Sequence, residues 1–170
     1  MHYGFDPSRA TPSFRPHFAG SVAKDTRFAQ LLEEVYAEEL ASVAADTYRS
    51  LLLEAEGGRL SERFDCFAME EIAHLRMVGE LCAALGRVPV LRAQIRIDPR
   101  RMGVDGEGIT ARTLQGMLTE ALREENHSID RYQTLMGKTQ DRVVRSTLAY
   151  LAEEEQRHAE ELERMLREIG

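Results

Sequence analysis

Cysteine, proline and tryptophan are scarce in this sequence. It contains two cysteines, five prolines and no tryptophan. Cys66 and Cys82 fall in one predicted helix, which places them about 24 Å apart at a rise of about 1.5 Å per residue, too far for an intramolecular disulfide. The sequence has no CxxC pair, which excludes a zinc or iron site built on cysteine sulfurs. We therefore expect two free thiols.

A long apolar run and an excess of positive charge are also missing. No apolar stretch reaches the roughly 18 to 20 residues that cross a bilayer, and the N-terminal residues lack the apolar core of a secretory signal. The formal net charge of -7 argues against a nucleic-acid partner. We expect a globular cytoplasmic protein that binds neither membranes nor nucleic acids.

Four segments with helical periodicity are present, separated by glycine and proline. Asp25, Thr110 and Thr139 are expected to cap helix N-termini, and Gly86 and Gly137 are expected to end helices. The predicted helices run from Thr26 to the Gly57–Gly58 break, from about Leu60 to Leu85, from Thr110 to about Met136, and from Thr139 to the C-terminus.

The lengths of the connections predict the topology. Links of about two and three residues follow the first and third helices, which forces each pair into an antiparallel hairpin. The middle link, residues 87 to about 109, can span about 70 Å when extended, enough to run the length of a bundle. We predict an all-α fold: a four-helix bundle of two antiparallel hairpins joined by a long crossover, in residues 25–170. Residues 1–24 form a separate N-terminal arm in this prediction.

Each predicted helix carries a glutamate in the middle of its apolar seam. Bundle helices show core residues at alternating steps of three and four, and leucine or phenylalanine is expected there. Glu39 and Glu125 occupy such positions in the first and third helices. Glu71 and Glu155 occupy them in the second and fourth, each followed three residues later by a histidine, His74 or His158.

Four carboxylates in one core would oppose folding unless they were neutralised. Protonation neutralises some of them, whereas two divalent cations would balance all four. One glutamate from each of two helices, with Glu-x-x-His from each of the other two, is the ligand set of di-metal carboxylate proteins. Glu71 and Glu155 are best placed to bridge the two ions. The predicted metal ligands are Glu39, Glu71, His74, Glu125, Glu155 and His158.

Two further residues lie on the same seams. Tyr132 follows Glu125 by two turns, and it either donates a hydrogen bond to a ligand carboxylate across the site or simply fills the core. Asp46 follows Glu39 by two turns, and it either supports the ligands or is a charge at the edge of the core beside Arg49. Another Glu-x-x-His, Glu124 to His127, falls off the seam, and we expect it on a solvated flank.

With these residues the sequence resembles the ferritin-like superfamily and, within it, the rubrerythrin-type proteins. The resemblance covers roughly residues 25–169, and the stretch EEIAHLRMVGELCAALG is similar to the second helix of that family and its glycine stop. The resemblance implies two metal ions, with iron expected, manganese as the alternative and zinc as a substitute. The sequence lacks the four-cysteine rubredoxin domain that rubrerythrins carry, and Ser128 stands where they often have another glutamate.

Three functions are consistent with this resemblance. The first is a non-haem di-iron or dimanganese oxidoreductase that acts on peroxide or dioxygen, with electrons from a separate donor; a dimanganese catalase would need no donor. The alternative is a ferroxidase or iron-binding protein with Fe(II) as substrate. The third is a metal-binding bundle without catalysis. We expect a homodimer, whereas a shell of many subunits would favour iron handling.

Overall fold

A computed structural model describes residues 22–54, 58–90, 95, 97 and 109–169. The described part contains helices and no strand, which confirms the predicted all-α class. None of its helices has an 18-residue stretch apolar enough to cross a membrane. Most of the expected arm (1–24) and crossover (87 to about 109) lies outside the described residues. The helices are α1 (Thr26–Glu54), α2 (Arg59–Ala84), α3 (Ala111–Met136) and α4 (Arg142–Ile169).

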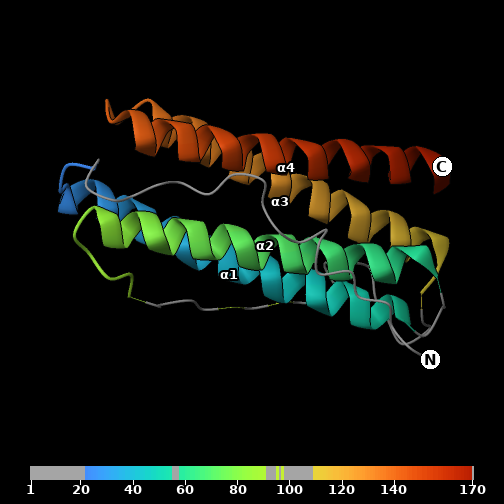
Figure 1. The fold of residues 1–170 in the computed structure, drawn as a ribbon. Helices are drawn as coiled ribbons and strands as arrows, with labels where there is room; N and C mark the ends of the chain where they lie inside the picture. The colour runs from blue at the N-terminus through green and yellow to red at the C-terminus, as the bar shows by residue number, and fades with distance from the viewer. Residues whose placement is uncertain (1–21, 55–57, 91–94, 96, 98–108, 170) are drawn as a thin grey trace.

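The four helices form two antiparallel hairpins that pack as two layers, α1 with α2 and α3 with α4 (Figure 1). Residues 55–58 join the first pair and residues 137–141 join the second, so both links are slightly longer than predicted but still short. In Figure 1, α2 ends at the opposite end of the bundle from the start of α3. The described helices therefore have the predicted two-hairpin topology.

The ends of the helices follow from local hydrogen bonds. Oδ1 of Asp25 accepts from the backbone N–H of Phe28 at 2.9 Å, and Oγ1 of Thr110 accepts from that of Thr113 at 3.2 Å. Both residues are therefore caps, as predicted. Gly86 ends α2 with a φ of 95°, a left-handed conformation that favours glycine at this position.

The predicted cap of α4 at Thr139 is wrong. The helix begins at Arg142, and Oδ1 of Asp141 accepts from the backbone N–H groups of Val143 and Val144, at 2.8 and 3.1 Å. The hydroxyl of Thr139 instead accepts from the backbone N–H of Asp141 at 3.2 Å. Thr139 therefore stabilises the turn that presents Asp141, and Asp141 satisfies the free N–H groups of the first helical turn.

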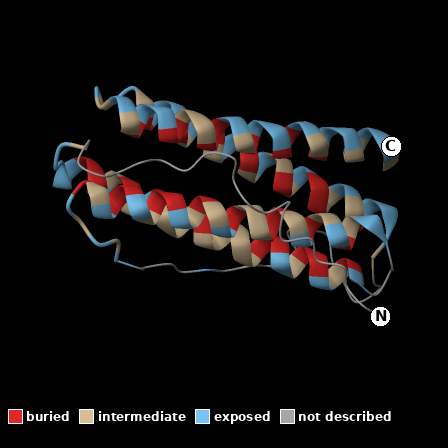
Figure 2. Ribbon diagram, in the orientation of Figure 1, coloured by how far each residue is buried: buried red, intermediate tan, exposed pale blue. Residues whose placement is uncertain are grey.

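The core consists of two apolar clusters, one toward each end of the bundle. The first includes Phe28, Leu32, Leu81 and Leu148, and the second includes Phe64. Figure 2 shows the buried residues along the facing sides of the helices. Most residues that stand at seam positions, in steps of three and four along each helix from its central glutamate, are buried. The following seam residues are only half-buried: Ser42, Leu60, Leu114, Ser128, Met165 and Ile169. The buried glutamates and histidines at mid-helix lie between these two apolar clusters.

Candidate metal centre

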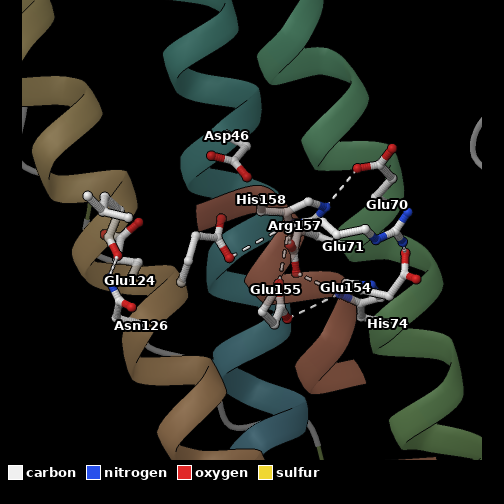
Figure 3. A network of polar contacts seen from close by, with 12 residues as sticks. Asp46, Glu70, Glu71, His74, Glu124, Asn126, Glu154, Glu155, Arg157 and His158 are labelled. Atoms are coloured by element: carbon white, nitrogen blue, oxygen red, sulfur yellow. Dashed lines mark hydrogen bonds and ion pairs between the residues drawn. The ribbon is translucent and has the colours of Figure 1, made fainter. Parts of the chain in front are cut away.

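All six residues predicted as metal ligands are buried at mid-bundle, and each is at most 7% exposed. α1 and α3 each supply one glutamate, and α2 and α4 each supply a glutamate and a histidine one turn apart. Figure 3 shows Glu71, His74, Glu155 and His158 gathered in the space between the helices. The residues fall into two groups of four, in each of which the candidate ligand atoms lie within 4.8 Å of one another.

The first group surrounds His74. Its Nδ1 atom lies 3.2 Å from Oε1 of Glu155, 3.4 Å from Oε2 of Glu71 and 3.7 Å from Oε2 of Glu39. α1, α2 and α4 therefore supply the donor atoms of this group. A histidine nitrogen with three carboxylate oxygens is a donor set that divalent transition metals accept.

The second group surrounds His158 and repeats this arrangement. Nδ1 of His158 lies 3.3 Å from Oε1 of Glu71, 3.3 Å from Oε2 of Glu155 and 3.7 Å from Oε2 of Glu125. Glu71 and Glu155 belong to both groups, and each directs one oxygen to each histidine. This is the placement that bridging carboxylates require.

The buried polar atoms of the cluster provide a test of whether metal ions fit. Buried polar groups in proteins nearly always have a hydrogen-bond partner. The candidate ligands of the two groups nevertheless contain six buried polar atoms that have no hydrogen-bond partner. They are Oε2 of Glu39, Oε1 of Glu71, both carboxylate oxygens of Glu155, and Nδ1 of His74 and His158. Two divalent cations would satisfy these atoms and balance the four carboxylates, so the donor set fits a metal pair.

Without metal the cluster favours bound protons. Burial, together with neighbouring carboxylates, raises the pKa of Glu39 and of Glu125 well above the ordinary value. Burial opposes charge on His74 and His158, but the facing glutamates outweigh it and raise the pKa of each imidazole. Burial likewise opposes charge on Glu155, but the two histidines outweigh it and lower its pKa. Metal ions would therefore replace protons when they bind.

Tyr132 reaches across the two layers. Its side chain is fully buried, and its hydroxyl donates to Oε1 of Glu39 at 2.5 Å. Oε2 of Glu39 is thereby left to face His74. Of the two alternatives for Tyr132, the structure favours the one in which it holds a candidate ligand.

Asp46 lies in a different environment. Its Oδ1 accepts from Arg49 at 2.7 Å, and Arg49 also donates to Oε2 of Glu124 at 2.5 Å. Burial is the main cause that raises the pKa of Asp46 to about 7. No hydrogen bond joins Asp46 to a candidate ligand within the part of the chain that the structure describes. Of its two alternatives, the pairing with Arg49 is the one observed.

The sequence did not predict the parts played by Glu70 and Glu124. Oε2 of Glu70 lies 2.7 Å from Nε2 of His158, and Glu124 is tied to buried Arg49 instead of lying free on a flank. In the sequence, these two residues are marked only by their position directly before a glutamate that is predicted to bind metal. His127, in contrast, has a side chain that is 61% exposed and lies 3.9 Å from Glu38, outside the centre as predicted.

Comparisons with known proteins support the fold described above. The family model described as Ferritin-like domain matches residues 28–170. A bacterioferritin of Desulfovibrio desulfuricans is 19% identical, with a TM-score of 0.72 over 84% of this chain and 80% of that one. The bacterioferritin BfrA of Mycobacterium tuberculosis is 19% identical, with a TM-score of 0.71 over 86% of this chain and 87% of that one. No curated protein sequence matches the chain. Since the family model spans most of its length, the chain belongs to the ferritin-like domain family.

Proposed function

We propose that the protein handles iron: it binds two Fe(II) ions in this centre and oxidises them with dioxygen or peroxide. The observation that carries the proposal is the bridging geometry of Glu71 and Glu155, each of which directs one oxygen to each histidine. Two metal ions held side by side can together deliver the two electrons that reduce dioxygen to peroxide or peroxide to water. Fe(II) would be both the bound ion and the electron donor.

The protein residues would supply charge, shape and proton transfer. Glu39, Glu71, Glu125 and Glu155 carry the negative charge that attracts two cations into the core. Because Glu39 and Glu125 hold protons more tightly than ordinary carboxylic acids, their deprotonation would accompany metal binding. The apolar clusters on either side exclude water from the cluster, which strengthens the electrostatic attraction for cations.

Iron is the metal favoured by the comparisons. The matched structure from Desulfovibrio desulfuricans belongs to a study of the diiron site in different catalytic states. Its protein was reduced in solution and allowed to reoxidise before crystallisation. Both structural relatives named above are bacterioferritins. Nothing in the comparisons supports manganese or zinc. Iron oxidation therefore has better support than the first expectation from the sequence, a rubrerythrin-like peroxide reductase.

Peroxide reduction with an external reductant would use the same site, so the two functions need a direct test. The metal-free protein is loaded anaerobically with two Fe(II) per chain and exposed to dioxygen or to peroxide. We expect oxidation much faster than that of free Fe(II), and continued turnover when more Fe(II) is supplied. His127→Ala should behave like the wild type, because this side chain is exposed and away from the cluster.

Two results would contradict the proposal. Oxidation no faster than that of free Fe(II) would leave a metal-binding bundle without catalysis. Catalytic peroxide consumption that depends on an added reductant, without turnover of added Fe(II), would instead support the rubrerythrin-like function. Sedimentation adds an independent measurement: the homodimer stays our prediction, and a large closed shell would favour iron storage.

A further inference from the structure

The two histidines of the centre are held differently, although the two hairpins repeat the same ligand pattern. Glu71 and His74 on α2 correspond to Glu155 and His158 on α4, with a constant offset along the sequence. The same offset relates three α2 residues around His158 to three residues of α4. The pairs are Arg63 and Thr147, Phe67 and Leu151, and Glu70 and Glu154.

The α2 residues Arg63, Phe67 and Glu70 form what we call the His158 cradle. The ring of Phe67 packs against the imidazole of His158 with centroids 4.7 Å apart. Oε2 of Glu70 lies 2.7 Å from Nε2 of His158 (Figure 3). The ring position of His158 is thus set by an aromatic contact and by a carboxylate.

Arg63 holds the cradle in place. Its guanidinium lies over the ring of Phe67, 4.2 Å from the centroid. Nη2 of Arg63 is 3.7 Å from Oε2 of Glu70, and its Nε is 2.7 Å from Oε1 of Glu161 on α4. Since Glu161 is one turn beyond His158, the contacts form a closed loop between α2 and α4.

The corresponding α4 residues do not form a cradle around His74. Thr147 donates its hydroxyl to the backbone carbonyl of Val143 at 2.9 Å. Glu154 forms an ion pair with Arg157 on its own helix, as Figure 3 shows. Among the described residues, no carboxylate forms a hydrogen bond or ion pair with Nε2 of His74.

A carboxylate that accepts from Nε2–H keeps a proton on that nitrogen and fixes the orientation of the ring. When a metal ion displaces the second proton, the lone pair of the ring is on Nδ1. Nδ1 of His158 is the atom that faces Glu71, Glu125 and Glu155. The cradle therefore presents the metal-binding nitrogen of His158 in the correct orientation before any ion binds.

We propose that Glu70, held by Arg63, is a positioning residue for the metal position beside Glu125 and His158, and that the position beside Glu39 and His74 has no equivalent. The inference rests on the proposed metal centre and adds that its two positions are controlled by different residues. Loss of a carboxylate that orients a metal-binding histidine typically lowers affinity about 10- to 100-fold. We expect this loss at one position only.

The test compares Glu70→Leu and Glu70→Gln with the matched pair Glu154→Leu and Glu154→Gln. Each metal-free protein is titrated with Co(II), which reports binding by its absorption and does not oxidise in air. Crystals grown with limiting Co(II) then give the occupancy of each position from anomalous scattering. The orientation of the His158 ring is read from crystals of each metal-free variant.

We expect Glu70→Leu to weaken one of two Co(II) equivalents about 10- to 100-fold, with the lost occupancy beside Glu125 and His158. Its His158 ring should lose the single orientation that turns Nδ1 toward Glu71, Glu125 and Glu155. Glu70→Gln retains an acceptor oxygen, so it should keep this ring orientation and lose less affinity. The Glu154 variants should bind like the wild type.

Equal loss at both positions, or an equal effect of Glu154→Leu, would overturn the inference. So would normal Co(II) binding by Glu70→Leu, in which case the metal centre itself would stand. If Glu70→Leu does not fold, as judged by circular dichroism, the Glu70→Gln variant decides through affinity alone. A wild-type protein that binds no Co(II) would contradict the proposed metal centre together with this inference.

Discussion

The hydroxyl of Tyr132 on α3 donates to Oε1 of Glu39 on α1 at 2.5 Å and so joins the two hairpins at the centre of the bundle. Tyr132→Phe would remove the donor and leave Oε1 buried without a partner. We expect the metal-free variant to lose about 1–3 kcal/mol of unfolding free energy, measured by urea denaturation. Tyr36→Phe is the control, because its hydroxyl has no hydrogen bond within the described part of the chain. Equal losses in the two variants would contradict the assigned contact.

Glu71→Leu should separate the requirements of the metal from those of the fold. The substitution replaces one of four crowded core carboxylates with an apolar side chain, so the metal-free protein should gain stability at high pH, where the histidines are neutral and the carboxylates repel one another. The variant should also fail to load two metal ions, because Glu71 faces both histidines. Chemical denaturation and metal analysis measure the two effects. Strong destabilisation of the metal-free variant would show that the carboxylate serves the fold.

Replacing His74 or His158 with alanine should weaken metal binding. Each substitution removes the only nitrogen ligand of one group, so we expect about a hundredfold loss for one equivalent, or about 2.8 kcal/mol. Isothermal titration with a divalent metal measures the loss. His127→Ala should bind normally, since that side chain lies outside the centre. A similar loss in all three variants would point to a general effect on folding.

Stability should depend on pH in opposite ways with and without metal. The raised pKa values of Glu39, Glu125, His74 and His158 mean that the folded metal-free protein binds protons more tightly than the unfolded chain. Their contribution is complete below the ordinary values of 4.5 and 6.5 and is lost as the pH rises through the raised values. Glu155, with a lowered pKa, contributes fully above the ordinary glutamate pKa of 4.5, and this contribution is lost as the pH falls toward the lowered value.

The melting temperature of the metal-free protein should therefore fall as the pH rises above 4.5 and then above 6.5, the ordinary pKa values of glutamate and histidine. The melting temperature of the metal-loaded protein should rise over the same change of pH, because metal must displace the protons. Thermal unfolding followed by circular dichroism, with and without metal, measures both curves. Parallel curves would contradict the assignment of these protons to the ligand residues.

The revised start of α4 can be tested separately. Asp141→Ala removes the acceptor for two backbone N–H groups, so it should lower stability by about 1 kcal/mol. Thr139→Ala removes a single bond in the preceding turn and should cost less. Thermal denaturation measures the stability that each variant loses. A larger loss in Thr139→Ala than in Asp141→Ala would indicate that Thr139 is the cap.

The positions of the buried charges could be predicted because helical periodicity is visible in the sequence. Glu71 and Glu155 stand in seams of phenylalanine and leucine, and the structure places both in the core. The repeat of the pattern in two hairpins then indicated that the four glutamates lie at one height. Seam positions depend only on the geometry of a single helix, so they can be predicted from the sequence alone.

The residues that support the cluster could not be predicted in this way. Glu70 is the neighbour of Glu71 and points about 100° away around the helix, toward a flank that becomes enclosed only because α4 packs against it. Glu124 meets Arg49 for the same reason, across α1 and α3. Such contacts depend on the angle and offset between helices, which a single sequence does not display.

Close backbone contacts lie mostly within each hairpin, and the two layers approach each other less closely. Separating the layers would break the contacts of the ligand cluster and the ion pairs between the layers, and it would open both apolar clusters, which contain residues from all four helices. Such a motion would expose the buried apolar side chains to water, at a cost of about 25 cal/mol for each Å². We therefore expect metal ions to reach the proposed centre without a parting of the two hairpins, because that motion would expose the core and the cluster together.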